Sequence, residues 1–146
     1  MDLVIDIQCF KNKGYRIVPK EVGIVALNGN FCAHWIVSPP TNLCDLTEGD
    51  RRQNNWLSTH HHGLDYFEGE TPLKLVEKAL QDISKKARKI YVRGKEKWNI
   101  LHKITIREII NLEYNCDCPS FDKLSSDVYC IHHALKPDFH NFAVCA

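Results

Sequence analysis

Three strand-length segments open the chain, and the turns between them are only a few residues long. The segments cover residues 3–10, 16–27 and 31–37. The first alternates apolar and polar side chains, as a half-buried strand does. Residues 11–14 and 28–30 carry the Gly and Asn typical of tight turns. Since such connections are too short for a parallel crossover, the segments predict an antiparallel meander.

The rest of the chain alternates helical and strand patterns. Residues 41–70 show no clear period and are expected to be irregular. Thr71 followed by proline indicates a helix start, and apolar residues recur at helical spacing as far as Ala87. The further expected elements are a strand at 89–93, a helix at 96–103, a strand at 106–112 and a loop with a short helix at the C-terminus.

This order, β-β-β-α-β-α-β-α, predicts an α/β fold with three antiparallel strands followed by alternating helices and parallel strands. It resembles the ribonuclease H-like fold. A length of 146 residues with 44% hydrophobic residues is expected to form a single domain, residues 1–146.

The composition argues against a membrane partner and favours an intracellular location. The net charge of +1 gives no general attraction to nucleic acid, and no apolar run approaches the roughly 20 residues that cross a bilayer. We therefore expect no membrane partner. The seven cysteines are odd in number, and the strand-like pattern directly after Met1-Asp2 leads us to expect no signal peptide. These features predict an intracellular protein, cytoplasmic or nuclear, whose thiols are reduced or metal-bound.

Four ligand-type residues cluster near the C-terminus: Cys130, His133, His140 and Cys145. Thiolates and imidazoles in two short pairs are the donors of a tetrahedral Zn²⁺ site. We therefore predict a structural zinc. His132 is an alternative to His133. The alternative for this cluster is a free buried cysteine with exposed histidines and no metal.

The first strand resembles motif I of the 3′–5′ exonucleases that carry Asp-x-Glu. Here the match is Asp6-Ile7-Gln8. Two carboxylates on one strand face hold paired divalent metals in those enzymes, whereas the neutral Gln8 binds Mg²⁺ weakly. The resemblance thus predicts a degenerate two-metal site. Asp6 can also simply make a hydrogen bond within the sheet.

The other exonuclease motifs match only in part. Glu96 stands near the place of the motif II aspartate. In motif III, His133 to Asp138 preserves the acid, and His140 to Cys145 replaces it with a thiol. The alternative function is an active exonuclease dependent on Mg²⁺ or Mn²⁺. Its residues would be Asp6, Glu96, His133 and Asp138.

The second motif III frame is similar to the Maelstrom domain, a nuclease relative that carries a Glu-Cys-His-Cys zinc site. Glu21 matches the family's Glu, Cys130 and His133 match its Cys-x2-His, and Cys145 matches its last Cys. His140 competes as the fourth ligand. The resemblance implies RNA handling, with at most a weak ribonuclease activity that needs no catalytic metal.

A basic stretch with an interleaved tryptophan predicts contact with RNA or single-stranded nucleic acid. Its interpretation as a solvated helix face, and the function of a protein-interaction adaptor with a protein partner, are the alternatives. Residues 59–63, which include three histidines, are expected to be a polar loop, and Cys116 and Cys118 to be ordinary thiols. The predicted nucleic-acid contacts are Arg88, Lys89, Arg93, Lys95, Lys97 and Trp98.

Overall fold

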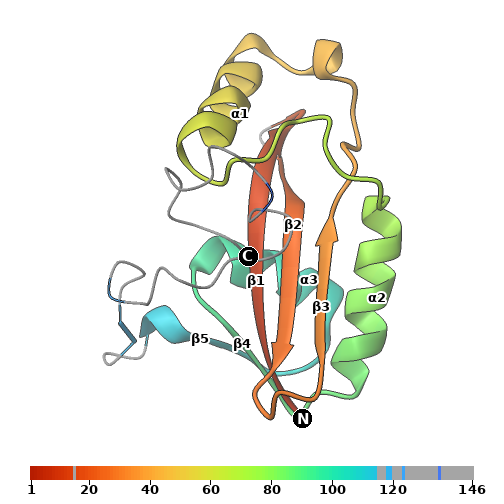
Figure 1. Cartoon of the computed structure of the whole chain (residues 1–146), viewed down its shortest axis with the longest axis vertical. Coiled ribbons are helices and arrows are strands. Elements are labelled where there is room, and N and C mark those ends of the chain that lie inside the picture. The colour runs from red at the N-terminus through yellow and green to blue at the C-terminus, as the bar shows by residue number, and fades with distance from the viewer. Residues whose placement is uncertain (15, 115–117, 120–122, 124–134, 136–146) are drawn as a thin grey trace.

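The fold is an α/β arrangement around one five-stranded mixed sheet with the strand order β3-β2-β1-β4-β5 (Figure 1). The computed structural model describes residues 1–14, 16–114, 118, 119, 123 and 135. The strand order and directions are those of the ribonuclease H-like topology, which confirms the predicted fold class. The strands are β1 (Asp2–Asn12), β2 (Arg16–Ala26), β3 (Cys32–Ile36), β4 (Lys89–Val92) and β5 (Ile109–Asn111). The helices are α1 (Glu48–His60), α2 (Leu73–Lys85) and α3 (Lys95–Ile104), with short 3-10 turns at Leu43–Asp45 and Leu112–Tyr114.

The predicted antiparallel meander is confirmed. β1 pairs with β2 from Leu3 opposite Ala26 onward, and β2 pairs with β3. One irregularity interrupts the first ladder, because Gln8 lies opposite Glu21 while Cys9 lies opposite Pro19. Lys20 is therefore the extra residue of a β-bulge, which bends a strand and re-aims a side chain.

The parallel half of the sheet is shorter. β4 pairs with β1 over three positions, ending with Val4 opposite Tyr91, and β5 pairs with β4. The strand predicted at 106–112 narrows to Ile109–Asn111. β1 thus extends well beyond the end of β4, and that overhang leaves room for side chains from α3.

Two helices cover one face of the sheet. Leu3, Ile5 and Ile7 of β1 are fully buried, and they belong to one cluster with Leu80 of α2 and Leu101 of α3. In Figure 1, α3 passes behind the strands and α2 lies beside them. Alternation along β1 turns Val4, Asp6 and Gln8 to the opposite face.

The region 41–70 was expected to be irregular, and this expectation is wrong, because residues 48–60 form α1. Apolar periodicity is missing because α1 buries polar residues, Asp50 and Asn54. The overlooked indication is the N-cap, where the Thr47 hydroxyl accepts from the Asp50 amide at 3.1 Å. The described order is thus β-β-β-α-α-β-α-β.

Asn54 ties α1 to the far end of β1. Its Oδ1 accepts from the Lys11 amide at 2.7 Å, and its Nδ2 donates to the Lys11 carbonyl at 2.8 Å. α1 accordingly lies at the end of the sheet away from the N-terminus (Figure 1). In the described part of the chain, no helix has the length and apolar character to cross a membrane.

Candidate functional site

The sheet face away from α2 and α3 carries the residues of motif I. Strand register puts Asp6 opposite Gly23, and Gly23 opposite His34, in one row across β1, β2 and β3. In the next row Gln8 lies opposite Glu21. Residues directly opposite each other in antiparallel strands share a face. The sheet thereby brings Asp6, Gln8, Glu21 and His34 together.

Asp6 forms an ion pair with Lys97, whose Nζ donates to the Asp6 carboxylate. Lys97 reaches it because β4 stops beside Val4, so α3 begins alongside the free overhang of β1. Burial raises the pKa of Asp6 above its usual value, and the charge of Lys97 opposes that rise. The ammonium group of Lys97 thus lies beside Asp6. A catalytic metal ion at this place would need further carboxylates there instead.

Replacing Lys97 by methionine is expected to raise the pKa of Asp6 further, because the main opposition to its burial is removed. A carboxyl with a raised folded pKa contributes stability at low pH, and that contribution is lost as pH rises through the folded pKa. In Lys97→Met the loss will extend to higher pH than in the wild type. NMR titration of the Asp6 carboxyl measures the shift.

Lys103→Met is the matched control, because Lys103 is exposed in the last turn of the same helix. It should leave the Asp6 titration as in the wild type. A Lys97→Met titration that coincides with the wild type would contradict the ion pair.

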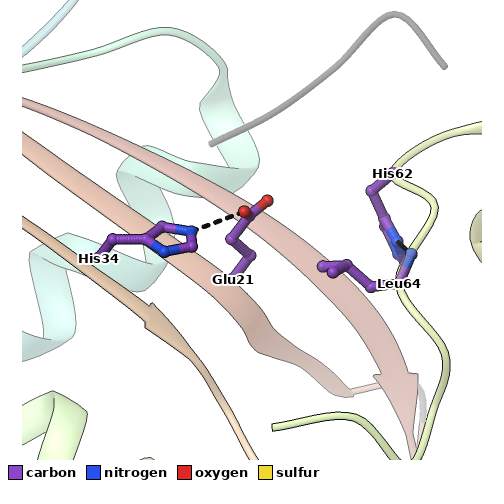
Figure 2. Close-up of polar contacts among 4 residues, drawn as sticks. All are labelled: Glu21, His34, His62 and Leu64. Atoms are coloured by element: carbon purple, nitrogen blue, oxygen red, sulfur yellow. Dashed lines mark hydrogen bonds and ion pairs between the residues drawn. The ribbon is translucent and has the colours of Figure 1, made fainter. Parts of the chain in front are cut away.

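Glu21 and His34 form the second polar pair on this face. Glu21 is 0% exposed, and its Oε1 lies 2.7 Å from Nε2 of His34, which is partly exposed (Figure 2). Gln8, opposite Glu21, is 2% exposed, and its Nε2 has no partner in the part of the chain that the structure describes. Glu21 and His34 thus form one carboxylate–imidazole pair, and the neutral Gln8 adds no second carboxylate for two adjacent metal ions.

The remaining predicted metal ligands lie outside the described residues. They are Cys130, His133, His140 and Cys145, and Asp138 of the alternative site is outside them too. Within the described ranges, no group of three or more His, Cys, Asp or Glu side chains is placed to hold a metal ion. Glu21 is the one predicted zinc ligand whose place the structure gives. The zinc site stays a prediction.

The basic stretch is divided between two ends of β4. Arg88 precedes the strand and holds Asp2 through Nε at 2.9 Å, while Lys89 begins it. Lys95 and Lys97 follow its other end.

Arg93 directly follows β4, so the cations beyond that strand are Arg93, Lys95 and Lys97. Trp98 packs against the main core, donates from Nε1 to the Ile109 carbonyl at 3.2 Å and stacks on His102. Its indole thus has a structural role beside the predicted one. Glu96, the motif II residue, is exposed.

Two neighbouring pockets share His61, which follows α1, and two residues of α3. An inner pocket of about 210 Å³ lies at the end of β1, where Gln8, Cys9, Lys97 and His61 are among its lining residues. Burial raises the pKa of the Cys9 thiol to about 12, so this cysteine is no nucleophile at neutral pH.

An outer pocket of about 430 Å³ adjoins the first, since His61, Glu96 and Lys97 line both. Arg93, Gly94, Lys95 and Glu113 complete its described lining. Burial, then the charge of Lys97, lowers the pKa of His61. Its position is a surprise, because residues 59–63 were expected to be a polar loop.

That expectation is wrong for Thr59 and His60, whereas residues 61–63 lie beyond the helix. α1 continues through His60, and His61 follows it as the C-cap. His62 is 0% exposed, packs edge-on against Phe10 and accepts from the Leu64 amide at 3.1 Å through Nδ1 (Figure 2). The expectation failed because the helix α1, which ends at His60, was not predicted.

Comparison with protein-family models, with curated proteins and with solved structures found no match to this chain.

Proposed function

We propose that this chain is a zinc-stabilised, nuclease-like domain that binds RNA or single-stranded nucleic acid and has a degenerate two-metal site. The observation that carries the proposal is the outer pocket. There the cations Arg93, Lys95 and Lys97 outnumber the acids Glu96 and Glu113 around a hollow at the carboxyl end of β4. Ligands gather at the carboxyl ends of parallel strands in α/β folds.

Phosphate is the group that suits this pocket. Lys95 and Lys97 stand in the first turn of α3, whose N-cap Gly94 has no side-chain hydrogen bond. A helix N-terminus carries partial positive charge and free amides, which favour an anion. Two lysines and an arginine add full charges. The pocket therefore supports phosphate contact without a metal ion.

The sheet face that carries Asp6 and Gln8 argues against two-metal hydrolysis. Asp6 is engaged by Lys97, and Gln8 stands where a second carboxylate is required. Two divalent ions bring about four positive charges, which these residues do not offset. The active Mg²⁺- or Mn²⁺-dependent exonuclease with Asp6, Glu96, His133 and Asp138 is for this reason the weaker proposal.

For zinc, the proposed ligands are Cys130, His133 and Cys145, with either His140 or Glu21 as the fourth. Glu21 suits the Maelstrom-like set because it is a buried carboxylate oriented by an imidazole. The zinc would have a structural role. A weak, metal-independent ribonuclease activity belongs to the same resemblance.

An apolar pocket supports the second candidate, a protein-interaction adaptor. It has a volume of about 400 Å³ and lies across β1, β2 and β3 on the face of Asp6. Val25, one of its lining residues, is 52% exposed. Exposed apolar surface is typical of protein interfaces, so binding with little dependence on salt would favour this candidate.

The test is binding of a labelled single strand across a range of salt concentrations. Lys95→Gln with Lys97→Gln is expected to weaken binding of all sequences alike. It should also reduce the slope of log K against log salt by about 1.4, since each phosphate contact on a single strand contributes about 0.7.

Lys86→Gln with Lys103→Gln is the matched control, because both lysines are exposed and lie away from the outer pocket. It removes the same charge and should change the slope little. An equal loss in both double variants would indicate a general charge effect and count against the pocket. Circular dichroism verifies that each variant is folded.

A further inference from the structure

α1 presents an aromatic pair to solvent. Trp56 is 54% exposed, and its ring lies parallel to the His60 imidazole, with centroids 5.5 Å apart and planes at 17°. The helix buries Asp50 and Asn54 on its other side. The pair therefore makes no contribution to the described core clusters, and its exposure calls for a different explanation.

The aromatic pair lies on the face of α1 next to the face that lines the inner pocket. Gln53 and Leu57 of α1 and the C-cap residue His61 line that pocket together with Lys97. Trp56 and His60 each precede one of these residues by one position, which is about 100° around a helix. The pair is therefore rotated by about a quarter turn of α1 from the residues that line the pocket.

The charge around α1 suits a polyanion. Asn54 fixes the turn between β1 and β2 to the helix through the Lys11 backbone. Residues 9–20 of that hairpin contain no acidic residue, and their cations are Lys11, Lys13, Arg16 and the buried Lys20, whose ammonium group is bound to three carbonyls. Lys13 and Arg16 are exposed. The hairpin end beside α1 is accordingly basic, whereas α1 itself begins with the acidic Glu48 and Asp50.

We infer that Trp56 and His60 form a stacking platform for an unpaired base of a single-stranded nucleic acid whose phosphates occupy the outer pocket. The inference rests on the proposed function and adds to it a contact with a base. Aromatic side chains stack on any base, so the platform distinguishes single strands from duplexes rather than one sequence from another.

The experiment compares two ligands that carry the same phosphates. Fluorescence anisotropy measures binding of an oligothymidylate of about 12 nucleotides and of an abasic strand of equal length. The wild type should prefer the strand with bases. Trp56→Ala should weaken its binding by about 5- to 150-fold, the range of one stacked base. Affinity of this variant for the abasic strand should be unchanged.

Leu75→Ala is the control, because Leu75 is similarly exposed, at 59%, on α2. It should bind both strands like the wild type, and Trp56→Phe should retain most of the preference. Equal binding of the two strands by the wild type, an unaltered preference in Trp56→Ala, or the same loss in Leu75→Ala would each overturn the platform and leave the proposed function standing. A wild type that binds neither strand would overturn both.

Discussion

Replacing Lys20 by methionine is expected to lower the free energy of unfolding by about 3 kcal/mol. Lys20 is 2% exposed, and its Nζ donates to the carbonyl oxygens of Val37 at 3.1 Å, Tyr66 at 2.8 Å and Glu68. Methionine fills a similar volume but leaves these acceptors without their donor, at about 1–3 kcal/mol for each buried one. Relief from burying an ammonium group offsets part of that cost.

Gly69 lies against one of these carbonyls, that of Val37. Its φ is +96°, and a Cβ there would lie 2.6 Å from the Val37 carbonyl oxygen. The Gly69 backbone therefore packs directly against Val37, whose carbonyl Lys20 also binds. Urea unfolding measures the loss, and Lys78→Met, at an exposed lysine of α2, is the control that should change stability by no more than about 0.5 kcal/mol. Equal stability of the two variants would contradict the role of Lys20.

Cys130→Ser is expected to remove bound zinc and to destabilise the fold by several kcal/mol. Structural zinc contributes about 10–16 kcal/mol of apparent binding free energy in small domains, and that energy stabilises the folded state. The wild type should contain about one zinc per chain by elemental analysis. A chelator should lower its unfolding midpoint toward that of Cys130→Ser.

Cys44→Ser is the matched control, because Cys44 is an exposed free thiol outside the proposed site. Its zinc content and its stability should equal those of the wild type. Glu21→Gln then discriminates between the two candidate fourth ligands, since only a ligand role for Glu21 would reduce the metal content. Wild-type protein that is folded without any metal would disprove the zinc site.

The sequence predicts the sheet better than it predicts the site. β1, β2 and β3 follow from alternation and short turns, because hairpin pairing is local in the chain. α1 does not, since Asp50 and Asn54 are the residues that it buries. Their burial depends on contacts with Lys11 and Thr47 that no hydrophobic pattern records.

The ion pair between Asp6 and Lys97 illustrates why site geometry escapes sequence reasoning. The two residues are separated by 91 positions, and their meeting depends on where β4 ends. Motif I alone indicates only that the acid Asp6 is followed, two positions later, by the neutral Gln8. In the same way, Arg88 and Lys95 belong to one basic stretch in the sequence, yet they lie at opposite ends of a strand.

β2 has two roles: it pairs with β1, and through Lys20 it anchors the Tyr66–Glu68 carbonyls. The bulge at Lys20 keeps these roles separate. A deletion inside a strand usually shifts the pairing of all that follows and exchanges its faces. Here Glu21 and Pro19 already oppose consecutive residues of β1, so a chain lacking residue 20 keeps the same partners on both sides. Pairing in the hairpin and anchoring of the Tyr66–Glu68 carbonyls are thus specified independently. Evolution or design can remove the anchor by a change of length without altering the order or direction of any strand.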